Sequence, residues 1–279
     1  MKKKVTFDFK HGKIEGIYAQ ANNPNAPLVI ITNGHNGFYT YGMFPYIQDQ
    51  FFKNGISSFS YNFSHGGVIG DSDYFSELGL YEKNSMRLET EDLCEIVRHL
   101  KNSEIAFPEG NKLFFFTHSL GGVPTIFATK KLLSEGYKID GVVLASTIKT
   151  LNVWPKSMID EWEKNGVYMM KNNRTKQELP QGKEFLEESK QADGAWSLQN
   201  ALKGLKTNFL IIHGEKDEAV PMEHSVTLNE WNEQYGNKTT LKIVSNGTHT
   251  YNTKHPFEGA SPELNSMIEE VCNWIQQQK

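Results

Sequence analysis

Residues 113–122, LFFFTHSLGG, decide the fold. The apolar first half, Leu113–Thr117, has the composition of a strand that is buried on both faces of a parallel sheet. A helical pattern, Ser119–Leu133, follows at once and ends before Gly136. A serine therefore lies at the apex of a tight turn between a buried strand and a helix.

That arrangement matches the nucleophile elbow of α/β-hydrolases. The strand and helix approach closely, so small residues are needed nearby, and Gly121 and Gly122 meet that need. The Ser119 hydroxyl would project above the sheet, and the Leu120 N–H at the helix start could bind an oxyanion. The usual G-x-S-x-G has glycine where this chain has Thr117, which is also small. The alternative is that Ser119 only caps the helix.

Strand and helix patterns alternate over most of the chain. The expected strands are Val5–Phe9, Ile14–Tyr18, Leu28–Thr32, Ile56–Asn62, Leu113–Thr117, Gly141–Ala145, Phe209–Ile212 and Thr240–Val244. The expected helices are Met43–Lys53, Ser85–Lys101, Ser119–Leu133, Met222–Gln234 and a final helix over Leu264–Ile275. Helices between strands predict an α/β fold, with a mostly parallel central sheet flanked by helices. The alternation stops over 147–200, where we expect a small cap inserted into a single domain spanning 1–279.

The candidate acid follows the strand Phe209–Ile212. Residues 213–221, HGEKDEAVP, resemble the α/β-hydrolase segment H-G-x-x-D-x-x-V-P, whose aspartate is the acid of the catalytic triad. The resemblance implies this role for Asp217, and not for the neighbouring Glu215 or Glu218. No carboxylate follows Gly141–Ala145, the other place where this fold can carry its acid. A charged surface turn is the alternative interpretation.

The candidate general base is His249, in the loop after the last expected strand. In the family that loop carries the histidine of the triad, and its order of serine, acid and histidine is kept here. His255 is the rival, but its neighbour Pro256 favours a role in loop packing. Either histidine could also be a solvated loop residue.

The second oxyanion donor is expected in the loop after the strand Leu28–Thr32. Residues 33–38, NGHNGF, resemble the H-G-F-x-G loop of esterases, with Asn33 where histidine is usual. The resemblance implies the backbone N–H of His35 as a donor beside that of Leu120. The alternative registration gives Asn36, and a simple turn-rich loop explains the same residues.

Composition and motifs exclude several classes of function. The chain has 279 residues, 29 Lys+Arg and 33 Asp+Glu, and a formal charge of −4, which argues against nucleic-acid binding. Cys94 and Cys272 fall in helical apolar patterns and are expected to be reduced. No metal, phosphate or dinucleotide motif is present, so we expect no metal and no cofactor. Apolar runs are too short for a membrane span or a signal peptide, so we expect a cytoplasmic protein.

The resemblance covers roughly 28–276 and is weakest over the cap. It is nearest to small esterase- or lipase-like α/β-hydrolases with a short cap, including the feruloyl and cinnamoyl esterase type. It implies a serine hydrolase that cleaves small-molecule carboxylic esters with a short-chain or aromatic acyl group. Five apolar side chains could line the acyl pocket: Phe38, Tyr41, Trp154, Met158 and Trp162.

Three alternatives stay open. An aminopeptidase or oligopeptidase-like enzyme would need carboxylates at the site, and Asp160, Glu161 and Glu163 lie in the cap. A non-catalytic ligand-binding protein can share the fold. The stretch 154–170 faces either the site or another subunit, which leaves a homodimer open.

Overall fold

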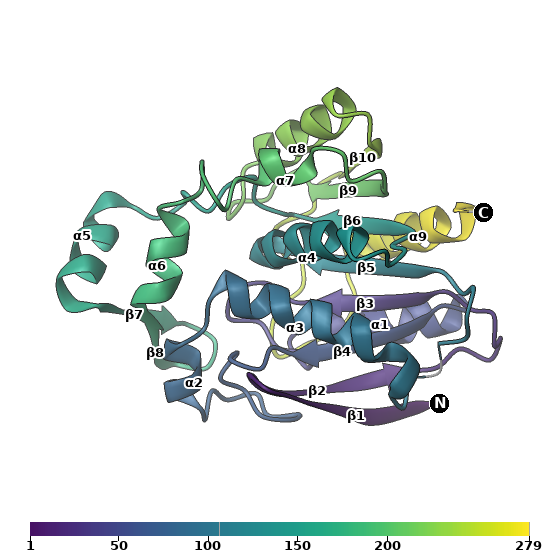
Figure 1. Cartoon of the computed structure of the whole chain (residues 1–279), viewed down its shortest axis with the longest axis horizontal. Coiled ribbons are helices and arrows are strands. Elements are labelled where there is room, and N and C mark those ends of the chain that lie inside the picture. The colour runs from purple at the N-terminus through teal and green to yellow at the C-terminus, as the bar shows by residue number, and fades with distance from the viewer. Residues whose placement is uncertain (106, 279) are drawn as a thin grey trace.

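The computed structural model describes residues 1–105 and 107–278, and its main feature is an eight-stranded sheet (Figure 1). In order across the sheet, the strands are β1 (Lys2–Phe9), β2 (Gly12–Ala19), β4 (Ser57–Asn62), β3 (Leu28–Thr32), β5 (Leu113–His118), β6 (Gly141–Ala145), β9 (Asn208–Gly214) and β10 (Lys238–Val244). β2 pairs antiparallel with both neighbours, and every other pairing is parallel. The predicted mostly parallel sheet is confirmed.

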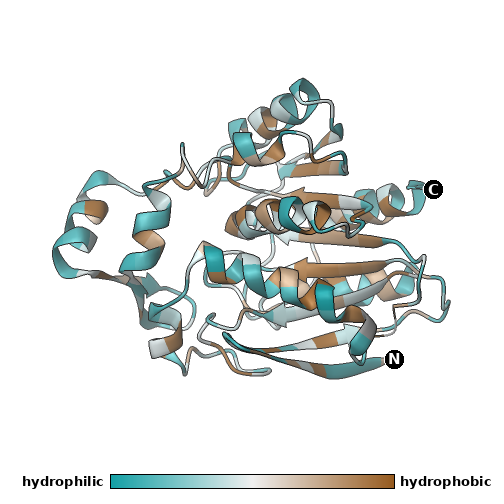
Figure 2. Cartoon of the chain, viewed as in Figure 1, coloured by the Kyte–Doolittle hydropathy of each residue, from teal (hydrophilic) through white to brown (hydrophobic). Residues whose placement is uncertain are grey.

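Helices cover both faces of this sheet (Figure 1). One face carries α3 (Met86–His99), α4 (Gly122–Ser134), α7 (Leu198–Leu202) and α8 (Glu223–Gln234), and the other carries α1 (Phe44–Lys53) and α9 (Pro262–Gln277). Strands β3, β5 and β6 are buried along their whole length, and Figure 2 shows them as the apolar centre. Burial on both faces explains why their sequences are continuously apolar.

Short elements complete the main body. They are α2 (Leu78–Glu82) and the 3₁₀ turns η1 (Leu100–Asn102) and η2 (Ser119–Gly121). The helix expected over Ser85–Lys101 ends at His99 and continues as η1. Ser85 is its N-cap, and the serine side chain accepts a hydrogen bond from the Leu88 N–H.

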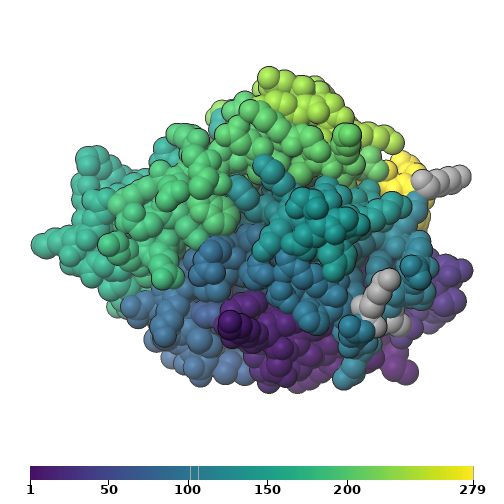
Figure 3. Space-filling view, viewed as in Figure 1, coloured from purple at the N-terminus to yellow at the C-terminus, as the bar shows by residue number. Residues whose placement is uncertain are grey.

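Between β6 and α7 the chain leaves the sheet and forms a group of elements that we call the insertion. Its members are α5 (Lys156–Asn165), β7 (Val167–Asn172), β8 (Gln177–Gly182) and α6 (Lys183–Ser189). β7 and β8 form an antiparallel hairpin of their own. Figure 3 shows the insertion as a projection at the left end of the molecule. Trp154, Met158 and Trp162 recur every four residues, a helical spacing that fits α5, but no pattern in the sequence predicted the hairpin.

Strand register brings four loops to one edge of the sheet. Thr32 of β3 pairs with Thr117 of β5, so the loops that follow these two strands begin side by side. Val244 of β10 pairs with Gly214 of β9 in the same way. Carboxyl ends of parallel strands form the usual ligand edge of such sheets. The insertion lies at this end of the molecule (Figure 1).

Candidate active site

Ser119 lies at the turn between β5 and η2 with a backbone φ of 55°. A positive φ is uncommon for a residue other than glycine and marks local backbone strain. A Cβ at Gly121 would overlap the Asn33 carbonyl oxygen, and a Cβ at Gly122 would overlap the Thr147 side chain. The close approaches therefore fall after the serine, which is why Thr117 is tolerated where the motif usually has glycine.

Asp217 lies in the loop after β9 with its side chain fully buried. Its Oδ1 accepts hydrogen bonds from the N–H groups of Ala219 and Val220, at 3.0 and 2.8 Å. Its Oδ2 lies 2.9 Å from Nδ1 of His249. Burial raises the pKa of Asp217, but the hydrogen bond and charge of His249 and the Val220 N–H outweigh it. The net pKa lies below its usual range, so the carboxylate is ionised.

The loops after β9 and β10 are in direct contact, which brings the acid and the imidazole together. A Cβ at Gly214 would overlap the carbonyl oxygens of Gly247 and Thr248. Glycine at this motif position is therefore required by the close approach of the second loop. The Glu215 carboxylate accepts from the Ser245 hydroxyl and the Asn246 N–H, at 3.0 and 2.9 Å.

His213, the first residue of the same motif, anchors the loop that carries Asp217 through both of its ring nitrogens. One ring nitrogen lies 2.7 Å from the Ser225 hydroxyl, and the other lies 2.9 Å from the Val220 carbonyl oxygen. Burial lowers the pKa of His213, so its ring is neutral. It holds the turn that presents Asp217.

His249 presents its ring to the outside, with 17% of the side chain exposed. His118 donates from Nε2 to the His249 carbonyl oxygen at 2.8 Å, and the two ring centroids are 4.6 Å apart. Burial, with a smaller effect from the charge of His249, lowers the pKa of His118 to about 3. His118 is therefore a neutral packing partner for His249. The rival His255 accepts from the Gly42 N–H at 3.1 Å, which is the packing role that its sequence favoured.

Two hollows open beside Ser119 and His249. Both are bordered by His35, Ser119 and His249. The larger has a volume of about 720 Å³ and an apolar wall formed by Ile148, Val153, Trp154 and Val220. The smaller has about 100 Å³ and is lined by Tyr41, Phe44, His118 and Arg174, among others. Ser119 and His249 make no hydrogen bond to each other among the described residues; such contacts often tighten only when substrate binds.

The loop after β3 passes directly beside the serine. A Cβ at Gly34 would lie 3.0 Å from the Ser119 Cβ and from the His118 carbonyl oxygen. The Gly37 N–H donates to the Gly34 carbonyl at 2.9 Å and closes the turn between them. His35 borders both hollows, whereas Asn36 borders neither.

Hydrogen bonds tie this loop to α2 and to the insertion. The Tyr81 hydroxyl donates to the Asn36 side chain and, at 3.1 Å, to Oε1 of Gln181 in β8. Oε1 of Gln181 also lies 3.0 Å from a ring nitrogen of His35. The conformation of the loop after β3 is therefore stabilised by side chains of α2 and of the insertion.

The predicted pocket residues divide into two groups. Tyr41 lines the smaller hollow and Trp154 the larger. Phe38, Met158 and Trp162 line neither. Phe38 is buried against Tyr41, and Trp162 is buried within the insertion against Trp154. Met158 is half-buried and packs on the core. The aromatic composition of these stretches indicated apolar contacts, but it could not show which side chains face a hollow and which face the protein interior.

Arg174 is the site residue that the sequence analysis missed. It lies in the turn between β7 and β8, and its guanidinium carbon is 4.7 Å from the centre of the Tyr41 ring. Asn172-Asn173 before it is a turn signal that could have predicted the hairpin. No signal in the sequence said that the turn would reach the serine.

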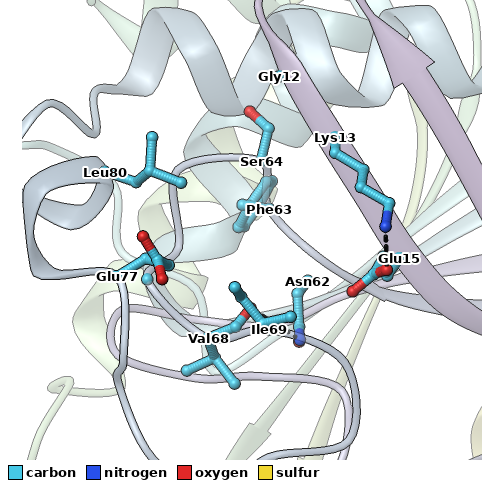
Figure 4. A pocket seen from close by; sticks show the side chains of 11 residues that line it. Gly12, Lys13, Glu15, Asn62, Phe63, Ser64, Val68, Ile69, Glu77 and Leu80 are labelled. Carbon is cyan, nitrogen blue, oxygen red and sulfur yellow. Dashed lines mark hydrogen bonds and ion pairs between the residues drawn. The ribbon is translucent and has the colours of Figure 1, made fainter.

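A separate cavity of about 170 Å³ lies beside β2 and β4 (Figure 4). Lys13 and Glu15 form an ion pair at its wall, at 2.5 Å. It shares no lining residue with the two hollows.

The described residues include no cluster of three or more His, Cys, Asp or Glu suited to a metal ion. Cys94 and Cys272 are buried free thiols. No helix over residues 1–105 and 107–278 has the length and apolar character that crossing a bilayer requires.

The sequence matches no protein-family model, and no curated protein is detectably similar to it. Solved structures are similar over nearly the whole chain. Est1E from Butyrivibrio proteoclasticus with bound ferulic acid is 17% identical, with a TM-score of 0.70 and 98% of each chain covered. A hydrolase described as putative, from Agrobacterium vitis S4, is 15% identical, with a TM-score of 0.72 and coverage of 100% and 98%. Mouse alpha/beta hydrolase domain-containing protein 10 is 14% identical, with a TM-score of 0.69 and coverage of 99% and 100%.

These likenesses and the sheet topology define the class. The chain has the α/β-hydrolase fold, as its elbow and its H-G-x-x-D-x-x-V-P segment predicted. The identities are too low to carry a substrate from any of these proteins to this one.

Proposed function

We propose that this protein is a serine hydrolase that cleaves carboxylic esters through an acyl-enzyme on Ser119. One observation carries the proposal. A serine with a backbone φ of 55° shares two hollows with an imidazole that is hydrogen-bonded to a buried carboxylate at 2.9 Å. A serine hydroxyl is a weak nucleophile without a base, and this arrangement supplies the base and its orienting acid.

In the proposed reaction, the Ser119 oxygen attacks the ester carbonyl carbon, and His249 takes the hydroxyl proton. The tetrahedral intermediate then expels the alcohol, which receives that proton from His249. Water, deprotonated by the same imidazole, then attacks the acyl-enzyme. The second tetrahedral intermediate releases the acid and expels the Ser119 oxygen, which receives the proton back from His249. Asp217 keeps Nδ1 protonated, so that Nε2 is the nitrogen that exchanges the proton.

The oxyanion would be held by two backbone N–H groups, those of Leu120 and His35. Leu120 is the second residue of η2, the 3₁₀ turn that leads into α4, and the first N–H groups of a helix have no helical partner. His35 is favoured over Asn36 because it borders both hollows next to Ser119. The contact between Gly34 and Ser119 supports this placement of the loop.

A peptidase is less well supported. Capture of a substrate amine would need a carboxylate at the site, and neither hollow has an acidic lining residue in the described chain. Asp160 is paired with Lys156 at 2.9 Å, and Glu163 with Lys190 at 2.6 Å. Glu161 is exposed on the same helix, α5. The larger hollow, with its wall of Ile148, Val153, Trp154 and Val220, suits a short-chain or aromatic acyl group better.

The test is hydrolysis of 4-nitrophenyl butyrate by the purified protein. We expect turnover with an initial burst of nitrophenol, because the acyl-enzyme accumulates when deacylation is slower. Ser119→Ala should abolish both phases while the protein stays folded. Cleavage of aminoacyl-naphthylamides without ester hydrolysis would favour the peptidase, and ligand binding without any turnover would favour a non-catalytic role.

A further inference from the structure

Arg174 lies in the smaller hollow beside the proposed nucleophile. Its position is defined by the hairpin turn, in which the Asn172 side chain accepts from the N–H groups of Arg174 and Thr175, at 3.0 and 3.2 Å. Asn172 is itself buried. The backbone of the turn therefore has one preferred shape, and from it the guanidinium of Arg174 reaches the Tyr41 ring.

The hairpin is docked on the main body at several points. Gln177 bonds the backbone of Phe75 twice, accepting from its N–H at 3.0 Å and donating to its carbonyl at 2.8 Å. Gln181 bonds Tyr81 and His35, as described above. A Cβ at Gly182 would overlap the Glu82 carbonyl oxygen. The turn that carries Arg174 is thus held in place on the main body, and both Arg174 and Ser119 line the smaller hollow.

Arg174 is also the one charged side chain of the Lys, Arg, Asp and Glu types that lines this hollow. No carboxylate of the described residues forms an ion pair with it. Tyr41 is uncharged, because burial raises its pKa even though Arg174 opposes this, and His118 is neutral as well. In the larger hollow, by contrast, Lys149 is paired with Glu223.

A guanidinium without an ion-pair partner, in a recess next to a nucleophile, is suited to bind an anionic group of the substrate. Its planar fork matches a carboxylate through two parallel hydrogen bonds. A recess of about 100 Å³ has room for only a few non-hydrogen groups, since liquid water occupies about 30 Å³ per molecule. The group that enters must therefore be small.

We propose that Arg174 binds a carboxylate of the substrate, and that the preferred substrates are esters with an ionised carboxyl group a few atoms from the scissile carbonyl. Half-esters of short dicarboxylic acids have this chemistry on the acyl side, and acylated hydroxy acids have it on the alcohol side. The inference rests on the proposed function, because it places the carboxylate relative to the acyl group on Ser119.

Two pairs of matched esters test it, with acid release followed at constant pH. On the acyl side, monoethyl glutarate is compared with ethyl 5-methylhexanoate, in which an isopropyl group replaces the carboxylate. On the alcohol side, 4-acetoxybutanoate is compared with 4-methylpentyl acetate. The measured quantity is the ratio of kcat/KM for the anionic ester to that for its neutral partner.

We expect this ratio to favour the anionic ester in one pair and to fall about ten- to a hundredfold in Arg174→Gln. Arg174→Lys should recover part of it, because the charge remains without the fork. Lys176→Gln removes the same charge from the same turn at a residue that lines neither hollow, and should leave the ratio unchanged. Added salt should lower the wild-type ratio.

A ratio that Arg174→Gln leaves unchanged in both pairs would overturn the proposal, as would an equal loss in Lys176→Gln. If 4-nitrophenyl butyrate is still hydrolysed in that case, the esterase assignment stands and only the role of Arg174 is lost. If no ester is hydrolysed and Ser119 does not react with a fluorophosphonate, the proposed function itself fails.

Discussion

Among the described residues, two pairs of a buried carboxylate and a partly exposed imidazole have nearly the same geometry. Asp217 lies 2.9 Å from His249, and Asp92 of α3 lies 2.6 Å from His11 in the β1–β2 turn. Both aspartate side chains are almost wholly buried, and both histidine rings are about one-fifth exposed. A serine, Ser64, even lies beside the second pair, where its N–H donates to Asp92 at 2.7 Å.

What differs is the serine and the space in front of it. Ser119 has a positive φ and borders two hollows together with His249. The Ser64 hydroxyl instead lies 2.9 Å from a ring nitrogen of His65. Figure 4 shows that hydroxyl at the edge of a cavity, and neither His11 nor His65 lines this cavity. A short contact between acid and imidazole therefore does not by itself indicate catalysis, and the proposed function depends on the strained serine and the open space beside His249.

The largest predicted difference is in activity, between the variants of His249 and of His11. His249→Ala removes the base and should lower kcat/KM for 4-nitrophenyl butyrate by about 10⁵-fold, in line with removal of a triad base elsewhere. His11→Ala should change kcat/KM by no more than about threefold. Steady-state kinetics on folded samples, checked by circular dichroism, measures both. A large loss in His11→Ala would erase the distinction.

Replacing Asp217 should mainly lower activity, whereas replacing Asp92 should mainly lower stability. Asp217→Asn should lower kcat by about 10⁴-fold, because the amide favours the wrong tautomer of His249, with a much smaller effect on the fold. Asp92→Asn should leave kcat nearly unchanged but lower the free energy of unfolding by about 3 kcal/mol, since a buried pair is broken. Kinetics and urea denaturation of both variants measure the contrast. Equal loss of activity in the two would contradict it.

Each pair also depends on one glycine. A Cβ at Gly34 would lie 3.0 Å from the Ser119 Cβ, and one at Gly12 would lie 2.7 Å from the Ser64 Cβ. Gly34→Ala should lower kcat/KM by about 10²-fold by displacing the oxyanion loop. Gly12→Ala should lower stability by about 2 kcal/mol through overpacking and keep activity. If Gly34→Ala is fully active, the loop does not serve Ser119.

The smallest effect concerns the pH dependence of stability. The hydrogen bond to Asp92 raises the pKa of His11 above its usual value of 6.5, although burial opposes this. A histidine with a raised folded pKa stabilises the protein fully below the unfolded pKa, and this gain is lost as pH rises through the folded pKa. The stability difference between wild type and His11→Gln should be largest near pH 6 and should shrink by pH 9. A difference that grows with pH would show the opposite linkage.

Local patterns predicted the sheet, the elbow and the loop residues that approach one another. The elbow is readable because strand, tight turn and helix are contiguous, and the acid loop is readable because Gly214 and Asp217 lie in one short motif. Half of the strand bounds coincide with the predicted ones and the others differ by one to three residues, since buried strands are continuously apolar. These features depend on neighbours in sequence.

The insertion could not be predicted in the same way. β7 has an apolar run of only four residues, Val167–Met170, of which only Met170 is buried, and β8 has no apolar run. The position of Arg174 depends on contacts of Gln177 and Gln181 with residues about a hundred positions away. Phe38 and Trp162 are aromatic like Tyr41 and Trp154, and composition cannot tell which of them face a hollow.

The central claim is that Ser119 is activated by His249, and labelling with a fluorophosphonate tests it most directly. Intact mass and peptide mapping should show one phosphonyl adduct, on Ser119, that is lost in His249→Ala and kept in His11→Ala. Folded wild-type protein that takes up no adduct, or that takes it up equally in His249→Ala, would contradict the account.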